Sequence, residues 1–377
     1  MPNFLEFFAG GGMARAGLGN DWACQWANDF DPTKARIYRE NWGGNELVEG
    51  DVAAVDPTTV PPADLAWASF PCQDLSLAGD KEGIGHSNAK KRTRSGTFWP
   101  FMRLMRTVRP TLIVLENVEG ALTSNDGQDI RAICSALSGA DYRFGPLVID
   151  AALFVPQSRP RLFVIAVRQG ATIPEHLCQF GPESLWHDNA VIRAFGSISD
   201  EARGKWIWWT LPAPVRRVRR LGTLIEKNPR GWVSWHSKQE TDYLLSLMNE
   251  LHRSKVRQAQ ELHRRIVGTV YRRTRNGKQR AEVRFDGVAG CLRTSAGGSS
   301  RQIVLEVNGS QVRSRLLSPR EAARLQGLPA SYWLPPEYND AYDVVGDGLC
   351  VPVVAHLRRY LLDPLAAANA EMAQAIA

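Results

Sequence analysis

The sequence presents a thiol, Cys72, directly after a proline, at the end of the apolar run "DLAWASF" and before a loop rich in Gly, Ser and Lys. A cysteine thiolate is a strong nucleophile, but a thiol with a pKa of about 8.5 is only slightly ionised at neutral pH. Catalysis would therefore need a neighbouring cation or an acid–base partner. Because cysteine is also a common core residue, Cys72 is either a packing residue or a nucleophile presented to a substrate.

Two later apolar runs carry residues that could assist a thiolate, one run at its end and the other at its beginning. Glu116 ends the run "TLIVLE", and Arg159 and Arg161 stand at alternating positions where "QSRPRLFVIAV" begins. Taken singly, the glutamate could be a solvated strand end and the arginines could pair with surface acids. A thiol, a carboxylate and two guanidiniums at the strand ends of one sheet favour a catalytic site instead.

A second group of residues suits a nucleoside-bearing ligand. "FFAGGGMARAGLG" has glycines 10 to 12 between an expected strand and helix, although their spacing departs from G-x-G-x-x-G. About 20 residues later Asp29 ends the next strand, where an acid can bind ribose hydroxyls, and Phe30 could lie flat on a purine. "GDV" adds Asp51 at a third strand end. Without a second set of phosphate-binding glycines, these features favour S-adenosylmethionine.

The first 170 residues alternate short β-rich runs with helical stretches, which predicts an α/β fold, a doubly wound, mainly parallel sheet. The expected strands are Leu5–Phe8, Ala23–Asn28, Leu65–Phe70, Leu112–Glu116, Leu147–Ile149 and Leu162–Val167. The expected helices are Thr33–Asn41, Thr97–Val108 and Ile130–Leu137.

This rhythm breaks after about residue 185, which predicts a second, smaller domain. "KWIWWTLPAPVRRVRR" is rich in Trp, Arg and Pro, and Trp206, Trp208 and Trp209 are expected to pack the domain junction rather than to read bases. A helix is expected from Glu240 to about Ile266. In "SPREAARLQGLP", Ser318 is a natural helix N-cap, with Pro319 first and Glu321 third in the helix.

Composition restricts the class of protein. Six cysteines without a C-x-x-C pair argue against a zinc site, another metal centre or a disulfide framework. Lysine and arginine number 46 against 39 acidic residues, a net charge of +7 that suits a polyanionic partner. No apolar stretch is long enough to span a bilayer and "MPNFLEFFAGGG" lacks signal-peptide features, so a cytoplasmic protein is expected.

Taken together, these segments closely resemble the cytosine-5 DNA methyltransferases. The motifs occur in the order of that family: "FFAGGG", "ANDFD", "GDV", "FPCQDLS", "ENV", "QSRPR", and finally "SRLLSPREAARLQGLP" and "VGDGLCVPVV". The resemblance implies a Rossmann-like S-adenosylmethionine-dependent sheet in a catalytic domain at 1–185. It also implies a target-recognition domain and closing motif at 186–340, and a segment at 341–377 that returns to the catalytic domain.

The resemblance implies a covalent mechanism on cytosine. The Cys72 thiolate would attack carbon 6 and activate carbon 5 for methylation, while Glu116 would hold the exocyclic amine and ring nitrogen 3. Arg161 would contact the base carbonyl, and Arg159 would act near the thiolate and the adjoining phosphate. Because carbon 5 is inaccessible inside a duplex, the cytosine would be flipped out of the stack.

The resemblance also assigns binding residues. Those expected to bind the cofactor are Phe8, Gly10, Gly12, Asp29, Phe30, Asp51, Val52 and Pro71. Those expected to contact double-stranded DNA are Gln73, Ser76, Lys90, Lys91, Arg92, Arg293 and Arg301, several of them in an expected lid loop from Gln73 to about Gly96. The expected enzyme is a monomer of the bacterial cytoplasm, associated with the nucleoid.

One position departs from the family pattern: this chain has Gly346-Asp347 where the family usually has Gly-Asn. A carboxylate there could weaken DNA binding, alter cofactor preference or be compensated by an arginine. Three other functions are open from the sequence: a transfer-RNA methyltransferase with the same catalytic core, a non-catalytic DNA-binding relative, and a Rossmann dehydrogenase. The last two leave Cys72 or Glu116 without a role.

Overall fold

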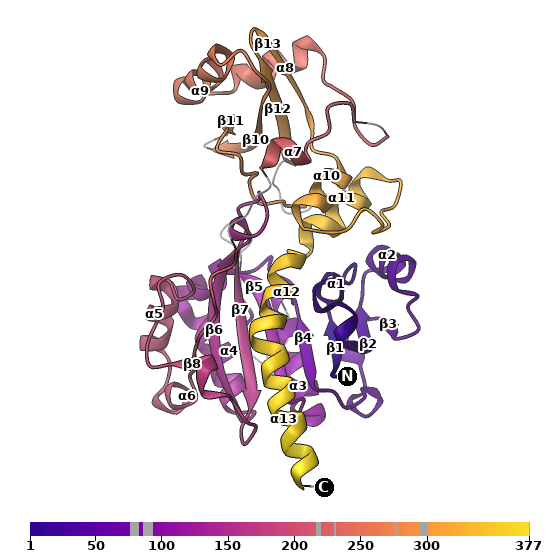
Figure 1. Ribbon diagram of the computed structural model, residues 1–377, viewed down its shortest axis with the longest axis vertical. Helices are drawn as coiled ribbons and strands as arrows, with labels where there is room; N and C mark the ends of the chain where they lie inside the picture. Colours follow the sequence, from indigo (N-terminus) through magenta and orange to yellow (C-terminus); the bar gives the residue numbers. More distant parts are fainter. Residues whose placement is uncertain are drawn as a thin grey trace. The chain divides into compact units, whose positions relative to one another are not determined.

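Two compact units make up the chain in the computed structural model (Figure 1). Unit 1 comprises 1–149, 160–214 and 353–377, and unit 2 comprises 150–159 and 215–352. The structure describes residues 1–75, 83–85, 93–215, 220–229, 231–275, 277–294 and 301–376. The sequence predicts domain boundaries at residues 185 and 340. The boundaries between the compact units lie near residues 150, 160, 214 and 352.

Unit 1 is built on a sheet that, in the described residues, has seven strands in the order β3-β2-β1-β4-β5-β7-β6. β1, β2, β3, β4 and β5 run parallel, whereas β7 is antiparallel to β5. The strands are β1 Asn3–Phe7, β2 Ala23–Asp29, β3 Leu47–Glu49, β4 Leu65–Ala68, β5 Leu112–Val118, β6 Tyr142–Asp150 and β7 Pro160–Arg168. The predicted α/β fold is confirmed.

Amphipathic helices cover this sheet. In α3 the apolar side chains of Phe98, Phe101 and Met105 are buried in the same core as the strands, while polar residues of the helix face solvent. The helices are α1 Met13–Leu18, α2 Pro32–Trp42, α3 Phe98–Val108, α4 Gln128–Ser138, α5 Asn189–Ser197 and α6 Asp200–Gly204. α5 and α6 flank a small ribbon, β8 Cys178–Gln179 and β9 Trp208–Trp209.

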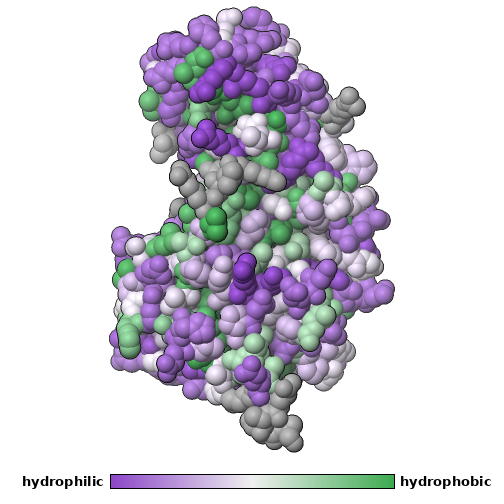
Figure 2. Space-filling model, in the orientation of Figure 1, coloured by the Kyte–Doolittle hydropathy of each residue, from purple (hydrophilic) through white to green (hydrophobic). Residues whose placement is uncertain are grey.

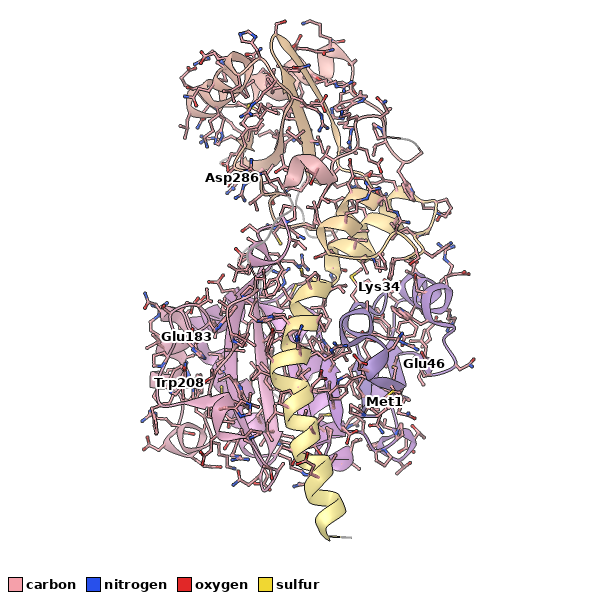
Figure 3. All side chains as sticks on the ribbon, viewed as in Figure 1. Met1, Lys34, Glu46, Glu183, Trp208 and Asp286 are labelled. Atoms are coloured by element: carbon pink, nitrogen blue, oxygen red, sulfur yellow. The ribbon has the colours of Figure 1, made fainter. Side chains whose placement is uncertain are left out.

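Trp206 and Trp208 pack inside unit 1, in an aromatic cluster with Phe195. Trp208 is labelled in Figure 3. Trp209 is fully buried and its indole N–H donates to the Gly145 carbonyl at 3.1 Å. The tryptophans therefore pack as expected, but inside unit 1 rather than at a domain junction.

The last helices of the chain also belong to unit 1 from Val353 onward. They are α12 Val351–Leu357, a π-helical turn at Arg358–Leu362, and α13 Asp363–Ile376, drawn in yellow in Figure 1. Arg358 donates to the Leu18 carbonyl at 2.8 Å, and the Trp22 indole donates to Asp363 at 2.7 Å. These bonds fasten the end of the chain to the turn that follows α1.

Unit 2 has a four-stranded antiparallel sheet in the order β11-β10-β12-β13 among the described residues. The strands are β10 Ile266–Arg275, β11 Lys278–Arg284, β12 Ile303–Asn308 and β13 Gln311–Leu316. The helices are α7 Leu221–Leu224, α8 Lys238–Ser246, α9 Glu250–Glu261, α10 Pro319–Leu325 and α11 Tyr338–Asp347. α8 and α9 bury Leu244 and Val256 against Val270, Val283 and Leu305 of the sheet.

The helix expected from Glu240 to Ile266 is wrong in its extent. Two helices, α8 and α9, occupy the range, because the Asn249 side chain accepts the N–H of His252 at 3.1 Å and so starts a new helix. After α9, the β-branched run that begins at Ile266 forms β10. No helix within the described ranges is both long and apolar enough to cross a membrane.

A buried ion pair joins the end of the sheet of unit 2 to α10. Both oxygens of Glu321 accept from the Arg315 guanidinium, at 2.6 and 2.7 Å, and both side chains are fully buried. Ser318 and Glu321 form the predicted capping box of α10. Glu321 also accepts the backbone N–H of Glu226 at 2.8 Å, so this carboxylate links three segments of the unit.

We predict that Glu321→Gln lowers the free energy of unfolding by about 3 kcal/mol or more, because it leaves the Arg315 guanidinium buried without its counter-charge. Urea unfolding followed by intrinsic fluorescence would measure this. Asp242→Asn is the matched control, since it removes an exposed partner of Lys238 and should cost less than about 1 kcal/mol. Equal unfolding midpoints for the two variants would contradict the prediction.

Candidate active site

Three residues of the glycine turn after β1 have a left-handed backbone. Phe8, Gly10 and Gly12 have φ of 56°, 56° and 74°, and the Gly12 amide donates to the Ala9 carbonyl at 2.8 Å. A Cβ on Gly12 would lie 2.2 Å from the indole nitrogen of Trp42, which itself donates to the Gly11 carbonyl. Gly12 is thus required by both conformation and packing.

Asp29 connects this turn to the end of β2. Its two carboxylate oxygens accept the backbone N–H of Gly10 at 2.7 Å and of Asp31 at 2.9 Å. The residue is 6% exposed, and burial raises the pKa of its carboxyl above the usual range. Each carboxylate oxygen can accept more than one hydrogen bond, so these contacts leave acceptor capacity on Asp29.

The other expected cofactor residues lie at the ends of β2 and β3. Phe30, beside the buried Asp29, is 68% exposed, so its ring is accessible to a ligand. The Gly50 amide donates to the Asp29 carbonyl at 2.9 Å, which brings the "GDV" segment next to β2. Asp51 is exposed and caps a 3₁₀ turn, Val52–Ala54, in which Val52 is buried.

The thiol of Cys72 is half-buried, four residues after β4. Its loop is tied to β5, since the Asn117 amide donates to the Phe70 carbonyl at 3.0 Å. Pro71, also half-buried, restricts the backbone between that bond and the thiol. By contrast, Cys134 lies in the core, where burial raises the pKa of its thiol.

Glu116 and Arg161 form an ion pair at the same sheet edge. The Arg161 Nε lies 3.3 Å from the Glu116 Oε1, and the side chains are 15% and 9% exposed. The antiparallel pairing of β5 with β7 produces this contact, because Val118 lies opposite Arg161. The guanidinium therefore holds the Glu116 carboxyl in place in a largely buried part of the site.

The loop after Cys72 is anchored where it is described. The Ser95 amide donates to the buried Asp74 carboxylate at 2.7 Å, and the Asp74 amide donates to the Ser95 hydroxyl at 3.3 Å. Gln73 is exposed. The other expected DNA contacts of this loop, Ser76, Lys90, Lys91 and Arg92, lie outside the described residues.

Arg159 belongs to unit 2, where it is 3% exposed. Its guanidinium donates to the carbonyls of Leu292 and Gly348, at 3.1 and 2.7 Å, and to the Cys291 sulfur at 3.5 Å. The neighbouring Gln157 donates to the Leu325 carbonyl at 2.9 Å. The "QSRPR" motif is thus divided, with Arg159 joining segments of unit 2 and Arg161 on β7 of unit 1.

Arg293 and Arg301 also lie in unit 2, on either side of residues 295–300. Arg293 is exposed and Arg301 is half-buried. Their guanidiniums lie over the rings of Tyr271 and Tyr338 respectively. No group of three or more metal-ligating side chains occurs in the part of the chain that the structure describes.

Sequence reasoning missed two residues that hold the site together. Asn117 stands in the "ENV" motif, but its bond to Phe70 depends on β4 and β5 being neighbours. Asp74 follows Gln73, but its reciprocal bonds with Ser95 close a loop of 20 residues. Their only signal in the sequence is their place beside the predicted nucleophile and acid.

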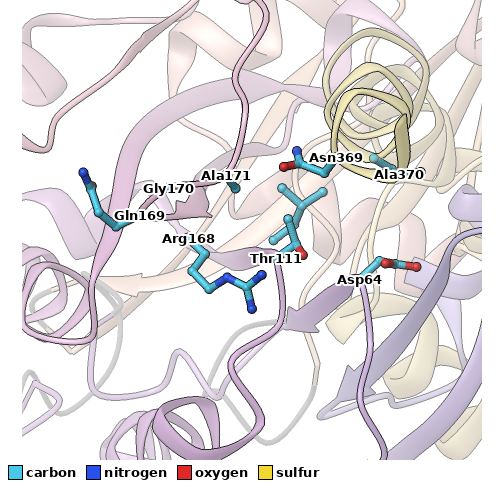
Figure 4. Close-up of a pocket in the computed structure, with 10 residues that line it drawn as sticks. Asp64, Thr111, Arg168, Gln169, Gly170, Ala171, Asn369 and Ala370 are labelled. Carbon is cyan, nitrogen blue, oxygen red and sulfur yellow. The ribbon is translucent and has the colours of Figure 1, made fainter. Parts of the chain in front are cut away.

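A cavity of about 450 Å³ lies at the opposite end of the strands, where β4 and β5 begin (Figure 4). Asp64 and Thr111, which precede β4 and β5, line it together with Arg168 at the end of β7 and Asn369 of α13. The Asn369 amide is engaged with Thr172 and Leu365. This cavity is separate from the end of the strands at which Cys72 and Glu116 lie.

Comparison with known proteins identifies a family for this arrangement. The family model described as C-5 cytosine-specific DNA methylase matches residues 2–362. The Type II methyltransferase M.NlaX of Neisseria lactamica is 26% identical over 373 residues, which cover 98% of this chain and 99% of that protein. M.HhaI of Haemophilus parahaemolyticus is 25% identical over 358 residues, 94% of this chain and 92% of that protein.

Solved structures confirm the fold. The Entamoeba histolytica methyltransferase EhMeth superposes with a TM-score of 0.62 at 15% identity, covering 97% of this chain and 99% of that one. The S. pombe Dnmt2 methyltransferase gives 0.60 at 18% identity, with the same coverage.

Strand β1, which precedes the glycine turn, carries a buried acid, Glu6, whose pKa changes when the chain folds. Glu6 accepts the Arg15 amide at 3.3 Å, and its Oε2 has no hydrogen-bond partner among the described residues. Arg15 instead pairs with Glu46, labelled in Figure 3. Burial raises the pKa of Glu6 from 4.5 to about 8, so the folded protein keeps this carboxyl protonated at neutral pH.

We predict that Glu6→Gln makes the protein progressively more stable than wild type as the pH rises from about 4.5 to about 8. Below this window the folded and unfolded wild-type chains both hold the proton. Within it only the unfolded chain releases the proton, so wild-type stability falls, whereas the neutral amide has no proton to lose.

The measurement is the difference in melting temperature between variant and wild type across that pH range. Glu175→Gln, at an exposed glutamate, is the control. A difference for Glu6→Gln that stays constant with pH would show that Glu6 ionises normally in the folded protein.

Proposed function

From the membership of this chain in the C-5 cytosine-specific DNA methylases, we propose a complete reaction for this DNA (cytosine-5) methyltransferase. It transfers a methyl group from S-adenosylmethionine to carbon 5 of a cytosine flipped out of duplex DNA, through a covalent adduct at Cys72. The observation that carries the proposal is the joining of the Cys72 loop to the Glu116 strand by Asn117, with Arg161 paired to Glu116.

The residues at the ends of β1, β2 and β3 fit S-adenosylmethionine. Asp29 keeps acceptor capacity for ribose hydroxyls although it already binds two backbone amides. The exposed ring of Phe30 offers a flat apolar face for adenine, and Asp51 offers an acceptor for its amine. The glycine turn and Pro71 allow close approach to the ligand. When bound, the cofactor supplies an electrophilic methyl group on a sulfonium.

Cys72 is the proposed nucleophile. Carbon 5 of cytosine is too weak a nucleophile by itself, and addition of the thiolate to carbon 6 makes the ring enamine-like and places electron density on carbon 5. Once carbon 5 carries the methyl group, loss of its proton re-forms the ring double bond and expels the thiolate. A half-buried thiol on a restrained loop suits this reversible addition.

Glu116 and Arg161 are proposed to hold the base. The Glu116 carboxyl binds the exocyclic amine and supplies a proton to ring nitrogen 3, which offsets the charge that develops as sulfur attacks. Arg161 contacts the base carbonyl, and its ion pair orients Glu116. The role of Arg159 near the thiolate and the adjoining phosphate remains a prediction from its place in the motif.

Duplex DNA is the proposed substrate, and the target base must leave the stack because enzymes cannot reach carbon 5 within the helix. The net charge of +7 assists binding to the phosphate backbone. The curated relatives are Type II methyltransferases, which makes a role in restriction–modification in the bacterial cytoplasm the natural setting. The enzyme is proposed to act there as a monomer, through unit 2 as the recognition domain.

We predict that Cys72→Ala abolishes methylation and leaves binding of S-adenosylmethionine nearly unchanged, because the thiol acts on the base. Duplex DNA with 5-fluorocytosine should trap wild-type protein as an adduct on Cys72, since fluorine cannot leave as a proton does. Transfer of a tritiated methyl group and mass spectrometry of the adduct are the measurements.

Cys178→Ala, which alters an exposed thiol, should retain both activities and serves as the matched control. Substantial turnover by Cys72→Ala, or an adduct on another residue, would contradict the assignment. Parallel reactions with duplex DNA and transfer RNA test the substrate class, and methylation of transfer RNA alone would overturn the DNA proposal. Bisulfite sequencing of DNA from expressing cells gives the target sequence.

We further predict that the wild-type enzyme is active with Asp347 and that Asp347→Asn binds DNA more tightly. Asp347 is exposed and is the last residue of α11, where the helix dipole disfavours a carboxylate. The amide removes a negative charge near a polyanion, so affinity at low salt should rise. Methylation that appears only in the Asp347→Asn variant would contradict the first part of this prediction.

A further inference from the structure

Two tyrosines of unit 2 hold the guanidiniums of Arg293 and Arg301 in defined orientations. The Arg293 guanidinium lies 5.5 Å from the centre of the Tyr271 ring, and its Nη1 donates to the Tyr271 hydroxyl at 3.2 Å. The Arg301 guanidinium lies 5.2 Å from the centre of the Tyr338 ring. A planar guanidinium on an aromatic ring keeps its N–H donors directed outward, in its own plane.

Each tyrosine is itself fixed. Tyr271 lies on β10 opposite Glu282 of β11, and Glu282 pairs at 2.9 Å with Arg273, which also stacks on the Tyr271 ring. Tyr338 donates its hydroxyl to the Leu317 carbonyl at 2.8 Å and stacks on Tyr342 with ring planes 11° apart. Both rings are therefore anchored in the framework of unit 2 before any ligand binds.

Helix α11 separates the two arginines. At its C-terminal end, a Cβ on Gly346 would lie 3.3 Å from the backbone of Arg293, so this glycine allows the chain to pass close to the helix. Near its N-terminal end, Asn339 accepts from Arg301, and the Tyr342 hydroxyl accepts the Gln302 amide at 3.3 Å. From Asn339 to Gly346 the axis rises roughly 10 Å, so the Arg293 backbone and the Arg301 guanidinium contact α11 near opposite ends of the helix.

These contacts differ from those of the structural arginines of the same unit. Arg265 and Arg313 bind the buried carboxylate of Glu306 at 2.6 Å, and Arg315 binds Glu321. Arg293 instead donates to a hydroxyl and Arg301 to an amide oxygen. Those two contacts orient the guanidiniums through neutral oxygen atoms. Hydrophilic side chains predominate on the face of unit 2 seen in Figure 2.

We propose that Tyr271 and Tyr338 are positioning residues that pre-orient Arg293 and Arg301 to bind two separate phosphates of the DNA backbone. Phosphates of one strand of B-DNA recur about every 3.4 Å of helix axis, so arginines that contact opposite ends of α11 meet different phosphates. This inference rests on the DNA substrate of the proposed function. It assigns to this unit a binding role that is independent of base sequence.

The test is equilibrium binding of the full chain to a duplex with the target site and to a duplex without it, over a series of salt concentrations. Arg293→Ala and Arg301→Ala should each weaken binding to both duplexes by the same factor. Each should reduce the slope of log affinity against log salt by about 0.9, and the double variant by about 1.8. Arg257→Ala, an exposed arginine of α9 paired with Glu250, should change neither quantity.

The tyrosines are tested by double-mutant cycles in which DNA affinity is measured. A general loss of folding would not produce coupling between one tyrosine and one arginine. Tyr271→Leu should weaken binding in wild type but add little in the Arg293→Ala background, because it acts through that arginine. Tyr271→Phe keeps the ring, loses the hydrogen bond and should fall between. Tyr338→Phe keeps the stack and should retain most of the affinity, whereas Tyr338→Leu should resemble Arg301→Ala.

Distinct results would overturn the inference. A salt slope for Arg293→Ala equal to that of Arg257→Ala would mean that no phosphate is bound there. A loss confined to the duplex with the target site would mean that Arg293 reads a base. Additive effects of Tyr271→Leu and Arg293→Ala would mean that the tyrosine does not act through the arginine. Failure of wild-type protein to bind any DNA would instead refute the proposed function itself, and this inference with it.

Discussion

The hydrogen bond from the Asn117 amide to the Phe70 carbonyl is the interaction on which the candidate site depends. It joins the loop that carries Cys72 to the strand that carries Glu116, at the edge where parallel β4 and β5 both end. A nucleophile and an acid on separate loops would need to be ordered by the substrate. Here the sheet and one buried amide order the proposed nucleophile and acid in advance, which would lower the entropy cost of reaching a reactive geometry.

Electrostatics divides the buried acids of unit 1 into two kinds. Glu116 is paired with the Arg161 guanidinium, whereas Glu6 is buried with no ion pair among the described residues to hold its charge, and its pKa is raised to about 8, so it stays protonated at neutral pH. Asp29 lies between these cases, since burial raises its pKa while two backbone amides stabilise its charge. The carboxylates proposed to bind ligands are thus those that backbone or side-chain donors already hold in place.

In unit 2, arginine has two uses that differ in their partners. Arg315 and Arg159 are buried and hold segments together through Glu321 and through backbone carbonyls. Arg293 and Arg301 lie over tyrosine rings that the framework fixes. A buried guanidinium that binds several chain segments stabilises the unit, whereas the two on aromatic rings are those proposed to bind phosphates.

The sequence alone determined the α/β class, the "FFAGGG" turn, the capping box at Ser318 and the motifs that identify the family, because these depend on neighbouring residues and on periodicity. Only the tertiary structure decided which distant groups meet. It divided the expected helix after Glu240, paired Arg161 with Glu116, and gave Arg159 its carbonyl partners in unit 2. It also brought Tyr271 to Arg293, 22 residues later in the chain. Strand register and order set such contacts, and these follow from the free energy of the whole packed chain rather than from local pattern.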